Sequence, residues 1–317
     1  MASLAEVFTG LVGQSSAVEL LTQAIARDRI APAYLFVGAH GIGKRRTANG
    51  FVKLLLQCDR SDLRNHPDLF WVEPTYLHQN KRYTAAEAEA EGIKRKASAI
   101  VRLDQIREIT QFLSRPPLES ARSVVVIEGA ETMPEAAANA LLKTLEEPGR
   151  ATLILLAPTI DSLLPTLISR SQRIPFYRLS QADLATVLTQ TGHEEILSQP
   201  EILDLAQGSP GDAIVQWETL QTLDAELLQQ ISQLPTNVPD ALRFAKQIAK
   251  ALDTETQIWL IDYLQQTWWR DLMQTGFQGD RSIALFQQLE QAKNYLKAYV
   301  QPQLVWEVTL MNCCPST

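Results

Sequence analysis

The residues best suited to chemistry lie in a glycine-rich loop, Gly38-Ala39-His40-Gly41-Ile42-Gly43-Lys44-Arg45. The loop follows a short apolar run and precedes a helical segment. Gly38, Gly41 and Gly43 would let backbone N–H groups curl around a phosphate, and Lys44 would reach its terminal oxygens. The pattern predicts a phosphate-binding loop, and the alternative is a plain glycine-rich turn before a helix.

The eighth position of this loop is Arg45, where a working loop carries Ser or Thr to bind Mg²⁺. A guanidinium has no acceptor atom and cannot bind a metal. Thr47 lies two residues further on and should point elsewhere on the helix. The loop therefore keeps its phosphate-binding groups but lacks a magnesium ligand.

The second half of such a site is normally an apolar strand that ends in Asp-Glu, a metal ligand followed by a catalytic base. Here the β-branched run Ser123–Ile127 ends in Glu128-Gly129. Glu128 keeps a carboxylate on a longer side chain, and Gly129 removes the base. Phosphoanhydride hydrolysis depends on positioning and charge compensation. We therefore expect no metal site and no ATP hydrolysis.

The elements that would position these residues alternate between strands and helices. Apolar runs at Ala33–Val37, Ser123–Ile127 and Thr152–Ala157 predict buried strands. A helix is expected over Glu135–Glu147, where Pro148-Gly149 stops it. The first 178 residues therefore predict an α/β domain with a parallel sheet.

The rest of the chain is expected to be helical. Two short helical patterns fill 179–216, a small unit that ends at the turn residues 208–211. From 217 to 317, apolar residues recur at three- and four-residue intervals. The predicted fold class is thus α/β followed by all-α.

One long segment resembles a known family. The run Asn139–Pro148 (NALLKTLEEP) is similar to a helix of bacterial clamp-loader AAA+ subunits. Aligning on it places Glu128 and Gly129 at the metal-binding Asp and the catalytic Glu of the motor subunits. Leu11–Gln14 matches an N-terminal box that in the family lies near the adenine.

A second resemblance concerns an arginine. Residues 167–172 (LISRSQ) are similar to the Ser-Arg-Cys signature of the family, with Ser171 in place of cysteine. The resemblance implies that Arg170 is an arginine finger, which projects into a neighbouring subunit's ATP site. The alternative is a surface arginine in an ordinary ion pair.

The same resemblance implies three domains. They are an AAA+ phosphate-loop domain over 1–178 with an exposed insert at about 75–99, a helical lid over 179–216, and a helical collar over 217–317. In the lid motif 208–213, Asp212 replaces the arginine that senses nucleotide in the family. Residues 300–307 resemble the closing helix of the collar.

A decayed ATP site beside a kept finger is the combination found in delta-prime subunits. The resemblance implies assembly with clamp-loader ATPase (tau/gamma) subunits and the delta subunit, and contact with the β sliding clamp and primed DNA through the complex. It implies no required cofactor, and it leaves residual ATP or ADP binding open. Many delta-prime subunits carry a zinc module. This chain keeps only Cys58 and His66–Asp68, so we expect no zinc.

Two other functions are possible on sequence grounds. One is a working AAA+ ATPase. The other is a DNA-binding module, using Lys81, Arg82 and the basic run 94–96, or the Trp268-Trp269 pair. A net charge of −7 over 317 residues argues against DNA as the main partner.

The composition of the chain limits the class of protein to which it can belong. The chain is 45% hydrophobic and 21% charged, as expected of a globular protein of two or three domains. Its three cysteines form no disulfide framework. It has no membrane-length apolar run and no secretory signal at its start, so we expect a cytoplasmic protein.

Overall fold

The computed structural model of the protein describes residues 7–58, 63, 65–93, 98–232, 235, 237–275 and 279–314. The chain divides into two compact units, 1–186 and 187–317. Helix α8 (Gln181–Gln190) crosses the boundary between them. Each unit is described by itself.

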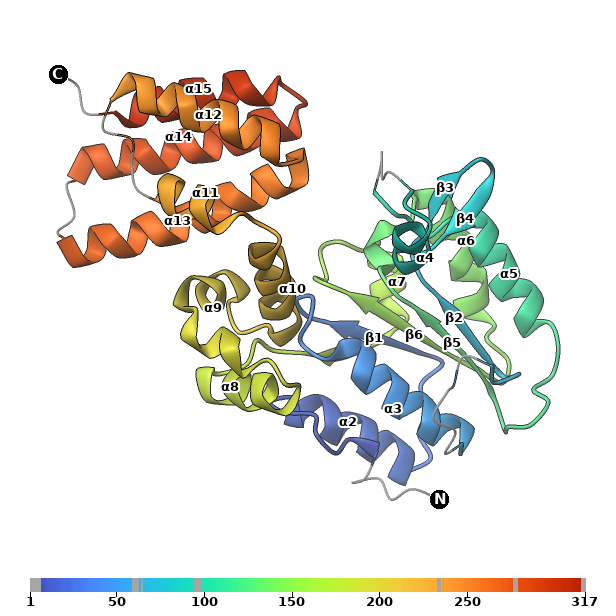
Figure 1. The fold of residues 1–317 in the computed structure, drawn as a ribbon. Coiled ribbons are helices and arrows are strands. Elements are labelled where there is room, and N and C mark those ends of the chain that lie inside the picture. The colour runs from blue at the N-terminus through green and yellow to red at the C-terminus, as the bar shows by residue number, and fades with distance from the viewer. Residues whose placement is uncertain are drawn as a thin grey trace. The chain divides into compact units, whose positions relative to one another are not determined.

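A five-stranded parallel sheet forms the centre of the first unit (Figure 1). Its strands are β1 (Ala33–Val37), β2 (Leu69–Val72), β5 (Ser123–Ile127), β6 (Ala151–Ala157) and β7 (Gln172–Pro175), in the order β2-β5-β6-β1-β7. All four neighbouring pairs are parallel. The central strands β5 and β6 are buried along their whole length, as expected for a sheet covered on both faces.

Helices cover both faces of this sheet, which gives three layers (Figure 1). Alternate strand residues point to opposite faces. Tyr34, Phe36 and Ile154 pack with α2 (Ser15–Ala26) and α3 (Lys44–Leu56) on one face. Leu35 and Leu153 pack with α5 (Leu103–Leu113), α6 (Glu135–Glu146) and α7 (Pro165–Ser169) on the other.

The insert contains a small antiparallel hairpin that the sequence analysis did not predict. Strands β3 (Tyr76–His78) and β4 (Lys81–Tyr83) pair through a turn at Gln79-Asn80, and both turn residues have positive φ. Helix α4 (Ala85–Ala90) follows, capped by Thr84 and Glu87 in a capping box. A short 3₁₀ turn (Ala130–Thr132) follows β5.

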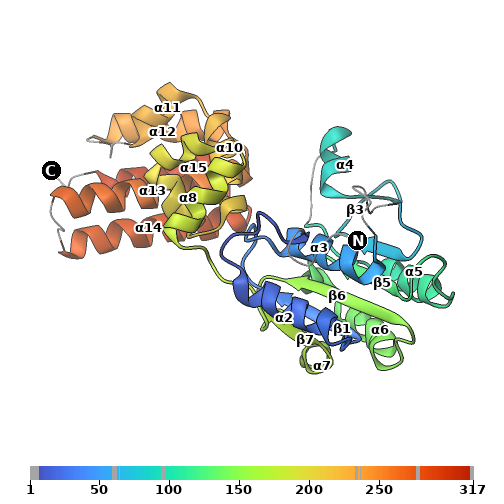
Figure 2. The ribbon, with the colours of Figure 1, turned by 90° about the horizontal axis from the view of Figure 1, so that it is seen from below.

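Every secondary-structure element described in the second unit is a helix or a 3₁₀ turn. The unit comprises a 3₁₀ turn (Glu194–Ser198), α9 (Pro200–Ala206), α10 (Pro210–Gln221), α11 (Ala225–Ser232), α12 (Val238–Ala251), α13 (Thr254–Thr275), α14 (Gly279–Lys297) and α15 (Pro302–Cys313). Figure 2 shows α13 and α14 running side by side. Trp306, Leu260 and Leu264 lie in the core that joins α12 to α15.

The predicted fold class is confirmed, since the chain is α/β followed by all-α. Predicted strands 33–37 and 123–127 match their observed bounds, and the predicted helix 135–147 ends one residue early. The division into domains at 178 and 216 stays a prediction. Residue 216 lies inside α10. No described helix is both long and apolar enough to cross a bilayer.

Candidate phosphate-loop site and surface arginine

The candidate site lies where the carboxyl ends of four parallel strands meet. The pairing aligns Val37 with Ala157 and Val72 with Ile127, so these strands end along one edge of the sheet. The glycine-rich loop follows β1, Glu73 follows β2, and Glu128 follows β5. Ligands of open α/β sheets bind at this edge. The topology therefore brings together the residues that the sequence placed in one site.

The loop has the geometry of a phosphate-binding turn. Gly41 and Gly43 have φ of 67° and 102°, a region that L side chains rarely adopt. Gly43 is the N-cap of α3, so the backbone N–H groups of the first turn face the cavity side of the loop. Lys44 is buried, and its ammonium donates to the carbonyl oxygens of Gly38 and Ala39.

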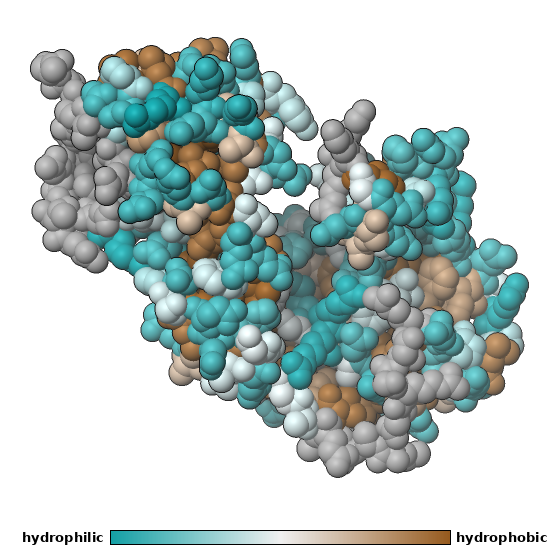
Figure 3. Space-filling model, viewed as in Figure 1, coloured by the Kyte–Doolittle hydropathy of each residue, from teal (hydrophilic) through white to brown (hydrophobic). Residues whose placement is uncertain are grey.

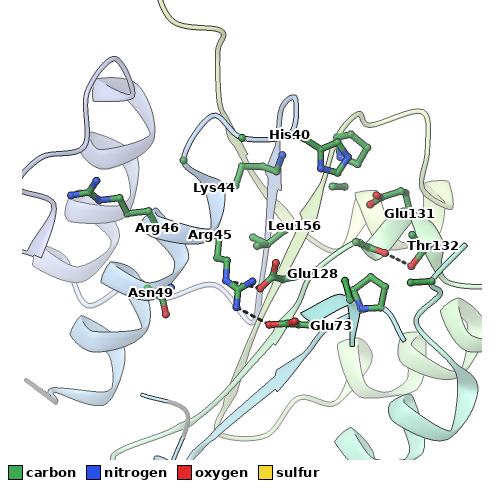
Figure 4. A pocket seen from close by; sticks show the side chains of 18 residues that line it. His40, Lys44, Arg45, Arg46, Asn49, Glu73, Glu128, Glu131, Thr132 and Leu156 are labelled. Atoms are coloured by element: carbon green, nitrogen blue, oxygen red, sulfur yellow. Dashed lines mark hydrogen bonds and ion pairs between the residues drawn. The ribbon is translucent and has the colours of Figure 1, made fainter. Parts of the chain in front are cut away.

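Arg45 forms ion pairs with two glutamates, Glu73 and Glu128, the second of which aligns with the metal-binding Asp of the family (Figure 4). Its Nη2 lies 2.7 Å from Glu73 Oε1, and its Nε lies 3.1 Å from Glu128 Oε1. Trp71 Nε1 donates to the same oxygen of Glu128 at 2.5 Å. Mg²⁺ does not fit this arrangement, because a guanidinium already neutralises the carboxylates that would bind the metal.

Thr47 does not replace the missing hydroxyl ligand. Its side chain is 1% exposed, and Oγ1 donates to the carbonyl of Gly43 at 3.0 Å within α3. This hydrogen bond holds the hydroxyl against the helix backbone. The prediction that Thr47 points elsewhere on the helix is confirmed.

Gly129, at the position of the catalytic base, has no room for a side chain. Its φ is 57°, and a Cβ built on it would lie 2.6 Å from Cγ of Pro74. Thr132 Oγ1 donates to the Gly129 carbonyl at 2.7 Å and accepts from the Val101 N–H at 3.1 Å, which fixes this turn. The backbone as well as the residue type therefore excludes a glutamate here.

The N-terminal box is joined to the loop through Gln14. This side chain is 2% exposed, and its amide donates to the carbonyl oxygens of Ile42 at 3.2 Å and Tyr177 at 2.7 Å. Its Oε1 accepts from the Tyr177 N–H at 3.1 Å. Gln14 thus fixes the glycine-rich loop relative to the segment after β7.

A cavity of about 860 Å³ opens between these elements (Figure 4). Its lining includes the loop, Arg46, Glu73, Glu128 and residues of the insert. The volume falls within the range of small-molecule sites. At the end of β6, the lining residues Ala157 and Pro158 offer no polar side chain.

Arg170 lies at the C-cap of α7, outside this cavity. The described residues that line the cavity do not include it. Its side chain is 38% exposed, its Nη2 lies 2.9 Å from Glu146 Oε1, and its Nη1 donates to the Thr166 carbonyl at 3.2 Å. The isolated chain therefore contains the surface ion pair that the sequence analysis gave as the alternative to an arginine finger. The finger role stays a prediction.

The residues considered for zinc have other partners. His66 is buried, its Nδ1 accepts from the Asp68 N–H at 3.1 Å, and its Nε2 lies 3.9 Å from Glu119. Asp68 accepts three backbone N–H groups, from Leu118, Glu119 and Ser120. Within the described residues, no group of three or more His, Cys, Asp or Glu could hold a metal ion. The expectation of no zinc stays a prediction.

Among the described residues of the DNA-binding alternative, the two tryptophans pack in the helical unit and Arg82 forms ion pairs. Trp268 is 2% exposed in the helical core, and Trp269 packs on Phe286 with ring centroids 5.6 Å apart. Arg82 is partly buried and pairs with Glu108 at 2.6 Å and Asp104 at 3.4 Å. Residues 94–96 lie outside the described part of the chain.

Asp212, at the position of the sensing arginine, has a local role. It lies in the first turn of α10, and its N–H donates to Oγ of the N-cap Ser209 at 3.2 Å. An acidic residue is favoured there by the helix dipole.

Glu73, Trp71 and Glu146 were missed by the sequence analysis. Glu73 and Trp71 could have been found, because the apolar run 69–72 (LFWV) is followed at once by an acidic residue. Such a run predicts a strand whose carboxyl end meets the others. Nothing in the sequence indicated that Glu146 would pair with Arg170, apart from its place in the segment that resembles clamp-loader subunits.

Comparisons with known proteins agree with the resemblance. A family model described as "DNA polymerase III, delta subunit" matches residues 13–180, and one described as "Cyanobacterial DNA polymerase III delta prime, C-terminal domain" matches residues 182–313. The chain is 32% identical over 180 residues to DNA polymerase III subunit delta′ of Bacillus subtilis, covering 52% of this chain and 48% of that protein.

Another delta′ subunit, of Pseudomonas aeruginosa, is 33% identical over 210 residues, covering 60% of this chain and 57% of that protein. The matches thus span about half the length of these curated relatives. The fold is similar to that in a crystal structure of a DNA polymerase III gamma subunit-related protein from Thermotoga maritima, with a TM-score of 0.55. That comparison covers 92% of this chain and 97% of the other at 16% sequence identity, so it shows a similarity of fold alone. The two family models together cover both units, and the chain belongs to the DNA polymerase III delta-prime family.

Proposed function

We propose that this chain is a non-hydrolysing subunit of a clamp loader, which supplies Arg170 to the ATP site of an adjacent ATPase subunit. The proposal includes assembly with tau/gamma and delta subunits, loading of the β sliding clamp onto primed DNA, and a place in the cytoplasm. The observation that carries it is the contact of Arg45 with Glu128, which fills the metal position of the chain's own site.

The second support is the place of Arg170. It lies at the surface on a short helix, so a neighbouring chain can reach its guanidinium, and its Glu146 partner is 53% exposed. An exposed ion pair contributes little to stability. Exchanging Glu146 for a nucleotide phosphate of an adjacent subunit would therefore have a small energetic cost.

The helical unit is suited to packing against other subunits. A groove of about 370 Å³ between α14 and α15 is lined by Tyr295, Leu304 and Val308, which are 45%, 51% and 45% exposed. The visible face of residues 187–317 carries apolar side chains among polar ones (Figure 3). Such a surface favours protein contacts over phosphate contacts.

The proposal is tested by clamp loading with a reconstituted complex that contains Arg170→Ala. We expect assembly to be retained and ATP-dependent loading to fall, because the adjacent site loses a charge that stabilises its transition state. Arg173→Ala is the matched control, an exposed arginine three residues away. Loading at the normal rate by the Arg170 variant would contradict the proposal.

A working ATPase is not favoured by the geometry. The base position is a glycine without room for a side chain, and the metal position is filled. We propose that nucleotide, if it enters the cavity, is not hydrolysed there.

A further inference from the structure

Arg45, Glu73, Glu128 and Trp71 form a cluster that joins three elements of the first unit. Arg45 comes from α3, Trp71 and Glu73 come from the end of β2, and Glu128 follows β5. One guanidinium lies between two carboxylates, at 2.7 Å and 3.1 Å. The indole of Trp71 donates to Glu128, and its ring centroid lies 5.7 Å from the guanidinium carbon.

The two carboxylates are less exposed than the arginine that joins them. The Glu73 and Glu128 side chains are 27% and 19% exposed, and that of Arg45 is 48% exposed. Like charges that share a partly buried site repel one another unless a cation lies between them. The cluster therefore requires a positive charge, and Arg45 supplies it.

A divalent cation would satisfy the same requirement. Carboxylate oxygens are the preferred ligands of hard divalent ions. Glu128 stands at the metal-ligand position of the family, and Arg45 replaces the other ligand. Among Arg45, Glu73 and Glu128, the charge that opposes a bound Mg²⁺ is thus carried by Arg45 alone.

We infer that Arg45 is the resident cation of this site and that it stands in place of a divalent metal. The natural chain does not bind a metal at Glu73 and Glu128, and removal of the Arg45 charge turns this pair into a divalent-cation site. The inference does not depend on Arg170 or on any partner subunit.

The neighbouring arginine provides a matched control. Arg46 also lines the cavity, but it extends to the other side of α3, away from Glu73 and Glu128 (Figure 4). Removing its charge changes the total charge of the chain by the same amount. It leaves the pairs between Arg45 and the carboxylates in place.

The test measures thermal unfolding of the full chain in EDTA and in Mn²⁺, with electron paramagnetic resonance to detect bound Mn²⁺. The variants are Arg45→Met, Arg46→Met, and Arg45→Met combined with Glu128→Gln. Methionine keeps an unbranched side chain that can pack on Trp71.

We expect Arg45→Met to unfold at a lower temperature than the natural chain in EDTA, and to gain a few degrees in Mn²⁺ as it binds the ion. The natural chain, Arg46→Met and the double variant should show neither Mn²⁺ binding nor a gain in melting temperature.

Two results would overturn the inference. One is a Mn²⁺ response of the natural chain equal to that of Arg45→Met, and the other is a folded Arg45→Met that binds no Mn²⁺. If Arg45→Met does not fold in EDTA, folding on addition of Mn²⁺ supports the inference, and failure to fold in either condition contradicts it. The proposed function is tested separately, because its experiment measures clamp loading by the Arg170→Ala complex and this one measures Mn²⁺ binding and thermal unfolding.

Discussion

Two arginines of this chain have opposite surroundings. Arg45 lies in the chain's own site between Glu73 and Glu128, whereas Arg170 lies at the surface with one exposed partner, Glu146. A guanidinium held by two carboxylates is fixed in place, and one in an exposed pair is easily released. In the proposed function, this difference is the residue-level basis for a site that does not hydrolyse ATP beside an arginine that serves another subunit.

Gly129 provides a first prediction. Gly129→Ala should lower the free energy of unfolding by about 1–3 kcal/mol, because alanine must adopt a left-handed φ and its Cβ meets Pro74. Gly149→Ala is the matched control, since Gly149 has φ of 59° with nothing within 4 Å of its Cβ position. Urea unfolding of both variants should show the larger loss for Gly129→Ala. Equal losses of unfolding free energy in the two variants would contradict the prediction, because they would mean that Pro74 moves aside at no energetic cost.

Asp68 provides a pH-dependent prediction. Burial alone would raise the pKa of its carboxyl, but hydrogen bonds from the backbone N–H groups of Leu118, Glu119 and Ser120 lower the pKa below its usual value. A lowered folded-state pKa means that the stabilisation is present above the unfolded-state pKa and is lost as pH falls through the folded-state value. Asp68→Asn should therefore cost about 2 kcal/mol near neutral pH, and less below about pH 4.

Urea unfolding at several pH values checks this prediction, with the exposed Asp161→Asn as control. A loss for Asp68→Asn that stays constant down to acid pH would contradict a carboxylate that is ionised in the folded chain.

At the level of elements, strands were predicted most accurately where the sequence has a clear run of β-branched residues. Strand 123–127 is a β-branched run between polar residues, and its observed bounds are the predicted ones. Strand β7 (Gln172–Pro175) was missed because three of its four residues are polar or proline, and tertiary pairing with β1 decides its structure. The hairpin of the insert was missed because its Gln79-Asn80 turn lacks the glycine that usually marks one.

The site was predicted in part for the same reason. The loop glycines and Lys44 follow one another in sequence, so their common role could be read directly. The partners of Arg45 lie 28 and 83 positions away, and only the sheet topology brings them together. A sequence can show that Arg45 is no metal ligand, but the structure is needed to find what it contacts instead.

The closing helix α15 carries a prediction for the helical unit. Trp306 is fully buried, and its Nε1 donates to Gln257 Oε1 at 2.9 Å. Trp306→Ala should lower the free energy of unfolding by about 3–5 kcal/mol, because it leaves a cavity and an unpaired buried amide. Trp269→Ala, at a tryptophan that is 43% exposed, should cost less. Chemical unfolding followed by circular dichroism compares the two, and equal losses would contradict the core role of Trp306.

At the level of the whole molecule, the α/β unit and the helical unit have separate roles in the proposal. The first unit carries both the filled site and the surface arginine, and the second presents apolar surface suited to assembly. The proposal therefore predicts that mutations in the chain's own site and at Arg170 have unequal effects on the assembled complex.

The most direct test is ATP turnover by a reconstituted clamp loader that contains either Lys44→Ala or Arg170→Ala in this chain. We predict that Lys44→Ala leaves turnover unchanged, and that Arg170→Ala lowers turnover at the adjacent site by about 10³-fold. Purified chain alone should release no phosphate from ATP with Mg²⁺. The reverse pattern, a loss with Lys44→Ala and none with Arg170→Ala, would contradict the account.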